Sequence, residues 1–128
     1  MKGKIRTANK RDIAAKHHRV LPRSKKELLK VLGAFFVFEA DGKIIGCCAL
    51  EIYSSRIAEI RSLVIDKDYQ NNGIGTILIK ACLTRAEKKK IQKILSVTDK
   101  VDVFRKCGFD TCLNDQYAMF ANPKKIKL

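Results

Sequence analysis

No apolar run in this 128-residue chain approaches the roughly 20 residues that a helix needs to cross a bilayer. The most apolar short stretch, residues 34–38, is followed at once by Glu39 and is typical of a buried strand. The basic first residues Lys2, Lys4 and Arg6 precede no long apolar segment, so we expect no secretory signal. These absences predict a protein without a membrane partner.

The sequence also lacks a disulfide framework and a zinc-ligand pattern. Its five cysteines are odd in number, and their spacing suggests no pairing. Cys47 and Cys48 are adjacent in a predicted strand and therefore point to opposite faces, while Cys82 falls on the apolar face of a predicted helix. His17 and His18 do not combine with the remaining cysteines into zinc-ligand spacing. We expect a reduced, cytoplasmic protein that holds no structural metal.

No linker, repeat or low-complexity segment divides the chain. With 46% hydrophobic residues, it is long enough to bury a core unaided. We therefore expect a single domain over residues 1–128, with a frayed basic tail at 123–128. The net charge of +14 attracts polyanions. Its basic clusters are not interleaved with aromatic stacking platforms, which favours a solvated surface over a nucleic-acid site.

The most informative segment that is present runs from Leu63 to Gly75. It begins as an apolar strand, continues through a loop rich in Asn and Gly, and ends at the start of a helix. Asn72-Gly73 is also a hairpin signal, but the apolar residues that follow have helical spacing. These residues are Ile74, Ile77, Leu78, Ala81, Cys82 and Ala86.

Such a junction suits a pyrophosphate. The first amides of a helix have no intrahelical partner, and the N-terminus of a helix is electropositive. Gly73 and Gly75 let a phosphate approach the backbone, where a Cβ atom would intrude. We therefore expect the amides of residues 71–76 to bind a phosphate group.

The order of predicted elements is βααβββαβαββ, an α/β arrangement whose first strands are antiparallel and whose long helix joins two parallel strands. A capping box at residues 24–27 starts the second helix, and Asp41-Gly42 predicts a hairpin turn. The expected strands are residues 4–7, 35–40, 43–53, 58–66, 93–98, 109–111 and 117–121. The expected helices are residues 11–17, 24–32, 73–89 and 101–106.

The loop itself carries a family resemblance. Gln70-Asn71-Asn72-Gly73-Ile74-Gly75 resembles the Gln/Arg-x-x-Gly-x-Gly/Ala signature of the GNAT superfamily of acyl-CoA N-acyltransferases. Residues 60–66 resemble the strand that enters this loop, and residues 103–109 the later helix that ends in Gly-Phe. Residues 21–24, 46–53 and 58–63 resemble the acetyltransferase domain of N-acetylglutamate synthase-type enzymes.

This resemblance implies a GNAT fold, with a mixed sheet of about six or seven strands flanked by about four helices. In that fold the strands on either side of the long helix splay apart, and the thioester of acetyl-CoA lies between them. The resemblance assigns cofactor-binding roles to Leu63, Val64, Ile65, Gln70, Asn71, Asn72, Gly73, Ile74, Gly75, Thr76 and Phe104. Phe104 occupies the position where many relatives have a tyrosine that protonates the departing thiolate, a role that a phenylalanine cannot perform.

Glu59 is the candidate general base. It precedes Leu63 in the same strand, and its neighbours Ala58 and Ile60 are apolar, which favours a carboxylate that accepts a proton near neutral pH. The same stretch resembles the strand that bears the base in protein-acetylating relatives. The alternative is a structural carboxylate paired with Arg56 or Arg61.

Four residues are candidates for acceptor binding: Arg19, Arg23, Arg61 and Ser62. An arginine binds a carboxylate through two parallel hydrogen bonds, as an amino-acid substrate requires. The alternative for the arginines is surface charge, and Ser24 is expected to cap a helix instead.

The sequence thus predicts transfer of an acetyl group from acetyl-CoA to a primary amine, with the α-amino group of glutamate as the leading acceptor. Two alternatives stay open: a protein or peptide N-acetyltransferase, and a non-catalytic acetyl-CoA-binding regulator. Many synthase-type enzymes carry an amino-acid kinase-like domain, and we expect none within residues 1–128. A homodimer is expected only from the habits of the superfamily.

Overall fold

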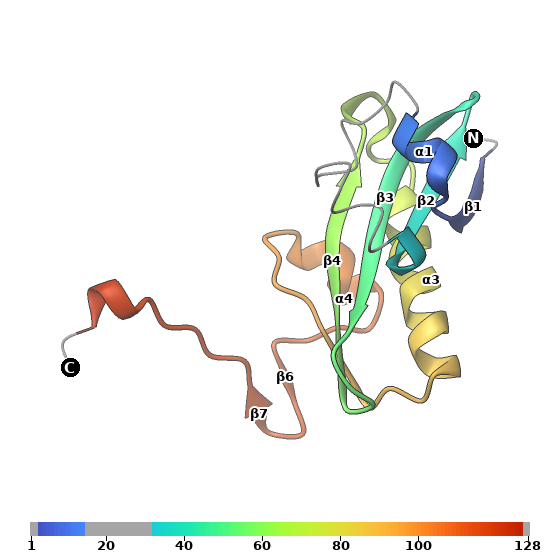
Figure 1. Cartoon of the computed structure of the whole chain (residues 1–128). Helices are drawn as coiled ribbons and strands as arrows, with labels where there is room; N and C mark the ends of the chain where they lie inside the picture. The colour runs from blue at the N-terminus through green and yellow to red at the C-terminus, as the bar shows by residue number, and fades with distance from the viewer. Residues whose placement is uncertain (1–2, 15–31, 127–128) are drawn as a thin grey trace.

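The structure, a computed structural model, describes residues 3–14 and 32–126 (Figure 1). Arg19, Arg23 and the helix predicted at residues 24–32 lie outside the described residues, except for a 3₁₀ helix at Leu32–Ala34. The strands are β1 Lys4–Thr7, β2 Phe35–Ala40, β3 Lys43–Ile52, β4 Ile57–Ile65, β5 Lys93–Leu95, β6 Cys112–Leu113 and β7 Gln116–Tyr117. The α-helices are α1 Lys10–Ala14, α3 Ile74–Lys88 and α4 Val101–Lys106, and 3₁₀ helices lie at Lys67–Tyr69 and Pro123–Lys125.

Five strands form one sheet in the order β1-β2-β3-β4-β5. The first four pair antiparallel, and β5 joins β4 in parallel after the crossover through α3. The predicted mixed α/β class is confirmed. The predicted six or seven strands do not share one sheet, because β6 and β7 form a separate antiparallel hairpin.

Two turns show how local sequence sets the strand connections. Asp41 and Gly42 both have positive φ, 53° and 71°, which confirms the predicted type I′ hairpin between β2 and β3. Asn114 and Asp115 also have positive φ, 51° and 63°. This second tight turn draws the final strands closer together than the predicted 109–111 and 117–121.

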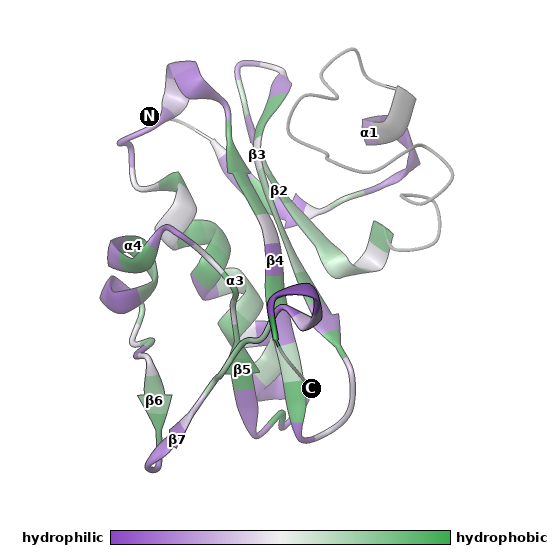
Figure 2. Cartoon of the chain, turned by 90° about the vertical axis from the view of Figure 1, so that its left-hand side faces the viewer, coloured by the Kyte–Doolittle hydropathy of each residue, from purple (hydrophilic) through white to green (hydrophobic). Residues whose placement is uncertain are grey.

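The sheet separates two apolar clusters (Figure 2). α3 and α4 cover one face, where Leu78 and Ile79 of α3 are fully buried. On β3, Cys48 faces this side and Cys47 the other, as predicted from their adjacency. The Cys48 and Cys82 sulfurs lie 3.8 Å apart, and burial raises the pKa of the Cys47 thiol to about 12. These three thiols are therefore packing groups rather than nucleophiles.

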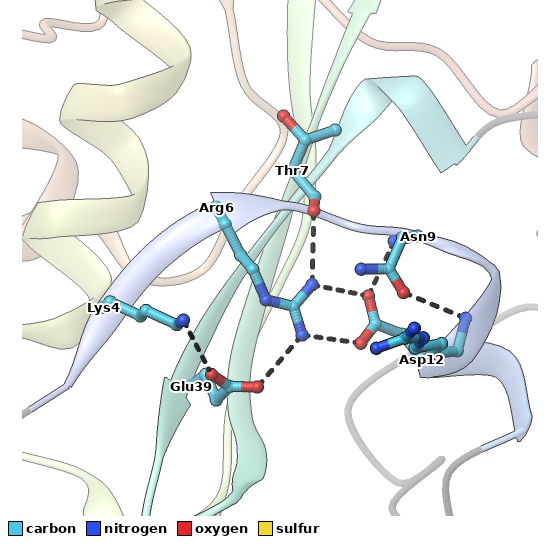
Figure 3. Close-up of polar contacts among 7 residues, drawn as sticks. Lys4, Arg6, Thr7, Asn9, Asp12 and Glu39 are labelled. Atoms are coloured by element: carbon cyan, nitrogen blue, oxygen red, sulfur yellow. Dashed lines mark hydrogen bonds and ion pairs between the residues drawn. The ribbon is translucent and has the colours of Figure 1, made fainter.

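A partly buried ion pair ties α1 to β1 (Figure 3). The guanidinium of Arg6 donates to both carboxylate oxygens of Asp12, at 2.9 and 2.8 Å, and also to Glu39 on β2. Burial alone would raise the pKa of Asp12, but hydrogen bonds from Arg6 and from the Asn9 amide outweigh it and hold the pKa below its usual value. The folded protein therefore favours ionised Asp12.

No helix in the described ranges 3–14 and 32–126 is both long and apolar enough to span a membrane.

Candidate active site

A fork opens between β4 and β5. Strand pairing ends at Glu59 and Leu95, and the hydroxyl of Ser96 then donates to the Ile60 carbonyl at 2.9 Å. β4 continues for six more residues without a β5 partner. A cleft of about 250 Å³ occupies this opening; its lining residues are 60–63, 96–100 and Phe104.

A β-bulge in β4 lies at the fork. Ser62 has φ 59°, and two residues of β4, Ser62 and Leu63, lie opposite Cys48 of β3. A bulge bends and twists the strand that carries it. Because Ser62 adopts a backbone conformation that L-residues seldom take, it is held there by the surrounding sheet.

The bulge also changes which side chains face α3. Ala58 and Ile60 pack toward α3, and a regular strand would continue that face at Ser62 and Val64. Leu63 and Ile65 pack there instead, while Val64 packs on the opposite cluster. The apolar side chains of β4 thus anchor both halves of the strand to the core, although its backbone is unpaired on the cleft side.

The loop before α3 leads into a helix start whose first backbone donors have no intrahelical partner. Asn71 and Gly73 both have positive φ, 65° and 75°, and the first intrahelical bond runs from the Ile77 amide to the Gly73 carbonyl. Gly73 provides no side-chain cap, so the amides of residues 74–76 precede the helical ladder. Because α3 has 15 residues, its dipole adds positive potential here.

Two predicted cofactor residues brace this loop through their side chains. Gln70 donates its amide to the Ile65 carbonyl at 3.2 Å, and Asn72 donates to the carbonyls of Tyr69 and Gln70. These bonds use carbonyls of the β4 end and of the loop as acceptors, and so leave the helix-start amides for a ligand.

Gly75 connects the loop to the cleft. A Cβ atom built on Gly75 would lie 3.6 Å from a Val103 methyl group of α4 and 4.0 Å from a methyl group of Leu63 on β4. The start of α3 is therefore next to the cleft-lining strand. Both distances are ordinary van der Waals contacts, so close packing does not require glycine here.

Phe104 forms part of the cleft wall. Its side chain is buried and meets Phe109 edge to face, with ring centroids 5.1 Å apart. The Phe104 ring has no proton to donate. Tyr117 carries a phenolic proton, but it lies in the separate β6–β7 hairpin and is 69% exposed.

Glu59 belongs to a cross-strand polar cluster on β3 and β4. The Tyr53 hydroxyl lies 2.6 Å from Glu59 Oε1 and 3.0 Å from Glu51 Oε2, and Arg61 donates to the same Glu51 oxygen at 2.8 Å. The single hydroxyl proton serves the closer Glu59, since Arg61 already satisfies Glu51. The hydrogen bond to Glu59 raises the pKa of Tyr53 to about 12, so Tyr53 stays a donor across the neutral range.

The structure brings part of the predicted site together. Arg61, Ser62, Leu63 and Phe104 line the cleft, and residues 70–76 form the adjoining loop and helix start. Glu59 directly precedes the cleft residues on β4. Val64 and Ile65 continue the unpaired edge beyond the cleft.

Sequence reasoning missed three features of the site: Tyr53 beside Glu59, the Ser96 bridge, and the bulge at Ser62. A signal for the bulge was present, because the apolar alternation of β4 changes parity between Ile60 and Leu63. No local sequence pattern indicated that Tyr53 contacts Glu59. The contact depends on the register between β3 and β4, which cannot be read from the sequence. In the part of the chain that the structure describes, no three or more His, Cys, Asp or Glu side chains are grouped so that they could hold a metal ion.

Comparison with known proteins agrees with this geometry. Residues 6–109 match the model of the Acetyltransferase (GNAT) family. The chain belongs to this family. It is 30% identical over 90 residues to an uncharacterised N-acetyltransferase of Chlorobaculum tepidum, a match that covers 70% of this chain and 58% of that protein. It is 32% identical over 92 residues to an amino-acid acetyltransferase of Pasteurella multocida, covering 70% of this chain but 21% of that protein.

Solved structures show the same fold. The Mycobacterium tuberculosis protein Rv2747, crystallised in complex with CoA, has a TM-score of 0.78 and 26% identity over 86% of this chain and 73% of that chain. N-acetylglutamate synthase from Neisseria gonorrhoeae, complexed with coenzyme A and N-acetyl-glutamate, has a TM-score of 0.76 and 25% identity. That match covers 91% of this chain and 30% of the synthase. The predicted GNAT resemblance is confirmed.

Proposed function

We propose that this chain transfers the acetyl group of acetyl-CoA to the α-amino group of a small amino acid, with glutamate as the leading acceptor. The observation that carries the proposal is the fork between β4 and β5, which opens directly beside the N-terminus of α3. The first feature leaves a strand edge without a strand partner, and the second provides amides without intrahelical partners. An acyl-CoA presents groups that match both: an amide-containing arm and a pyrophosphate.

The described residues fit this cofactor. The amides of residues 74–76 suit the pyrophosphate, and the absence of a Cβ at Gly75, which packing does not explain, leaves room for it to reach the backbone. The unpaired edge of residues 63–65 supplies hydrogen bonds to the pantetheine arm. When bound, acetyl-CoA supplies an activated acyl group whose carbonyl oxygen these backbone donors polarise.

We assign proton transfer to Glu59. An amino acid arrives as an ammonium ion, and its nitrogen needs a free electron pair before it forms a bond to the acetyl carbon. Glu59 takes one proton from the ammonium ion, and the free amine forms the C–N bond as the C–S bond breaks. The second proton of the nitrogen then passes through water to the thiolate, because Phe104 has no proton to give. Tyr53 is a positioning residue that fixes one oxygen of Glu59 at 2.6 Å.

The acceptor assignment draws on Arg61 and on the relatives. Arg61 projects from the cleft lip with a side chain 45% exposed, and its Nη1 donates to Glu51 Oε2 at 2.8 Å. The rest of its guanidinium fork suits a substrate carboxylate. The similarity to amino-acid acetyltransferases favours such a substrate, and Arg19 and Arg23 remain further candidates by sequence.

The test is a thiol-release assay with acetyl-CoA and a panel of free amino acids, polyamines and short peptides. We expect the highest kcat/KM with acidic amino acids, and a raised KM for the amino acid in Arg61→Ala with little change for acetyl-CoA. If only peptides are acetylated, the acceptor is a peptide rather than a free amino acid, and the proposed acetyl transfer still holds. If the protein binds acetyl-CoA but acetylates no amine, the enzymatic function is wrong and the protein is a non-catalytic regulatory module.

A further inference from the structure

The cleft at the fork has a larger neighbour. A groove of about 450 Å³ lies between β5, α4 and the β6–β7 hairpin, whereas the cleft itself has about 250 Å³. Ser96, Thr98 and Phe104 line both hollows, so the two adjoin one another. Acetyl transfer as proposed above uses the cleft and leaves the groove without a role.

The two hollows differ in chemical character. The cleft is lined by several polar side chains, among them Arg61, Asp99 and Lys100. The groove is lined largely by apolar side chains, which include Ile57, Leu95, Val101, Phe109, Leu113 and Phe120. In Figure 2 most of β5 and β6, which border the groove, is coloured green for hydrophobic residues. A ligand that occupied both hollows would therefore need a polar part and an apolar part.

Several polar side chains on the groove wall already have protein partners. Ser96 donates to a β4 carbonyl at 2.9 Å, and Lys93 donates to Gln116 at 2.6 Å. The carboxylate of Asp110 accepts from the Thr111 amide at 2.7 Å. Because these groups are bonded to the protein, the groove offers a ligand chiefly apolar contacts.

We propose that the groove receives the hydrocarbon chain of a medium-chain acyl-CoA, so that the protein also transfers acyl groups longer than acetyl. The inference rests on the proposed function, which places the thioester in the adjoining cleft. The bonds are the same: the amine nitrogen bonds to the thioester carbon as the C–S bond breaks. One proton of the ammonium ion goes to Glu59 and the second passes through water to the thiolate. The products are an N-acyl amino acid and CoA.

The position of the groove favours an acyl chain over a separate molecule. Phe104 is buried, forms part of the wall of both hollows and meets Phe109 edge to face. With the thioester in the cleft, the following carbons of the acyl chain begin beside this shared wall. Tyr117, Ala118 and Phe120 supply the wall on the side of the C-terminal segment. The groove is therefore a pocket built by this chain alone.

A chain in the groove should strengthen binding in proportion to its length. Burial of one methylene group corresponds to a decrease in Kd of up to about fourfold. Leu113 and Phe120 are 50% and 76% exposed, and a chain that covers them removes apolar surface from water. We expect the Kd to fall stepwise from acetyl-CoA to octanoyl-CoA and to level off once the chain outgrows the groove.

Calorimetric titration of the full chain without an acceptor amine measures this series. The probes are CoA and its acetyl, butanoyl, hexanoyl and octanoyl thioesters, each below its critical micelle concentration. Leu113→Asp and Phe120→Asp place a charge on the groove wall at exposed positions. They should remove most of the gain with chain length and leave the Kd of acetyl-CoA nearly unchanged.

Met119→Asp is the matched control for these variants. It adds the same charge next to Phe120, at a residue that is 89% exposed and does not line the groove. It should keep the full gain with chain length, and circular dichroism checks that each variant is folded. A Kd that does not fall with chain length, or an equal gain in all three variants, would overturn the proposal.

Amide shifts of ¹⁵N-labelled protein locate the acyl chain. Shifts that differ between the acetyl-CoA and octanoyl-CoA complexes should fall on residues 93–95, 109–113 and 116–120, which include the groove walls. Differences confined to other parts of the chain would show that the longer acyl group lies elsewhere, and would refute the assignment.

Turnover separates this inference from the proposed function. We expect acyl transfer to an amino acid from octanoyl-CoA as well as from acetyl-CoA, and Leu113→Asp should lower kcat/KM for octanoyl-CoA alone. Transfer of acetyl but not of octanoyl groups would sink the inference and leave the proposed function intact. Transfer from neither thioester, by protein that binds both, would contradict the proposed function, and the Kd series would still decide whether the groove holds the chain.

Discussion

β3 and β5 are both strands of the same sheet, yet they differ sharply in burial. Seven consecutive residues of β3 are buried, and the strand has partners on both edges and packing on both faces. The three residues of β5 are all half-buried, and beyond residue 112 the chain has no buried or half-buried residue up to 126. We call the buried part of the sheet around β3 the closed half and the part around β5 the open half. The closed half is a scaffold, whereas the open half has strand edges without a partner among the described strands. We place acetyl-CoA at the edge of β4 that β5 leaves unpaired.

The largest effect is expected from breaking the closed half. Leu78→Ala removes a side chain with no exposure from the contact between α3 and the sheet, and should cost about 3–4 kcal/mol of unfolding free energy. Leu113→Ala makes the same change at a position 50% exposed and should stay within about 0.5 kcal/mol. Chemical denaturation of both variants measures the contrast; equal losses would contradict it.

Next in size is the loss of the proposed base at the fork. Glu59→Gln keeps the shape of the side chain but cannot take the ammonium proton, and should lower kcat about 100-fold near neutral pH. Tyr53→Phe should lower kcat less, because Glu59 keeps its carboxylate and loses only the hydroxyl that holds one of its oxygens at 2.6 Å. An unchanged rate in Glu59→Gln between pH 6 and 9 would remove Glu59 from the mechanism.

A smaller effect should follow from the ion pair on the scaffold. Asp12→Asn should cost about 2 kcal/mol at neutral pH, since Arg6 loses its bidentate partner. The pKa of Asp12 is lowered by folding, so its contribution is complete above the unfolded value of about 3.9 and disappears as pH falls through the folded value. The stabilities of the two proteins should therefore converge in acid.

The control for that experiment is Asp115→Asn, an exposed residue at a positive φ that asparagine also adopts. It should leave stability nearly unchanged at every pH. A constant gap between Asp12→Asn and the parent protein down to strong acid would show that the ion pair does not cause the loss.

The smallest effect is expected at Gly75, where the start of α3 meets the cleft. A substitution there should change protein stability and acetyl-CoA binding in opposite directions. Gly75→Ala fits sterically, since its Cβ would make contacts of 3.6 Å and longer, and should raise helix stability by a few tenths of a kcal/mol. The same Cβ should hinder a phosphate and raise the KM for acetyl-CoA roughly tenfold, or about 1.4 kcal/mol. Gly33→Ala, at a site with open space around it, should change neither quantity. If Gly75→Ala lowered stability while it raised the KM, the weaker acetyl-CoA binding would follow from disturbed folding. That result would count against the phosphate role of Gly75.

The contrast between the halves also explains what the sequence could predict. The strands at β2 and β3, the Asp41-Gly42 turn and α4 lie where local patterns placed them, because buried alternation and turn chemistry act over a few residues. β5 ends three residues earlier than predicted, since Val97 and its neighbours have no strand to pair with. A local sequence pattern indicates that a segment suits a strand, but it does not indicate whether a neighbouring strand is available to pair with it.

At the site, the loop before α3 was predictable because its motif is continuous in sequence. The Ser96 bridge and the Tyr53–Glu59 contact were not, since each depends on the register between two strands. The positive φ of Ser62 has no residue-type signal of its own, because serine, unlike glycine, does not favour that conformation. Only the shift in apolar parity along β4 indicated it.

The most direct test of the account is to map acetyl-CoA binding on ¹⁵N-labelled protein, amide by amide. The account predicts that the largest shifts fall on the amides of residues 74–76 and 63–65, on both sides of the contact at Gly75. Saturable binding whose shifts avoid both segments, or no binding by folded protein, would contradict it.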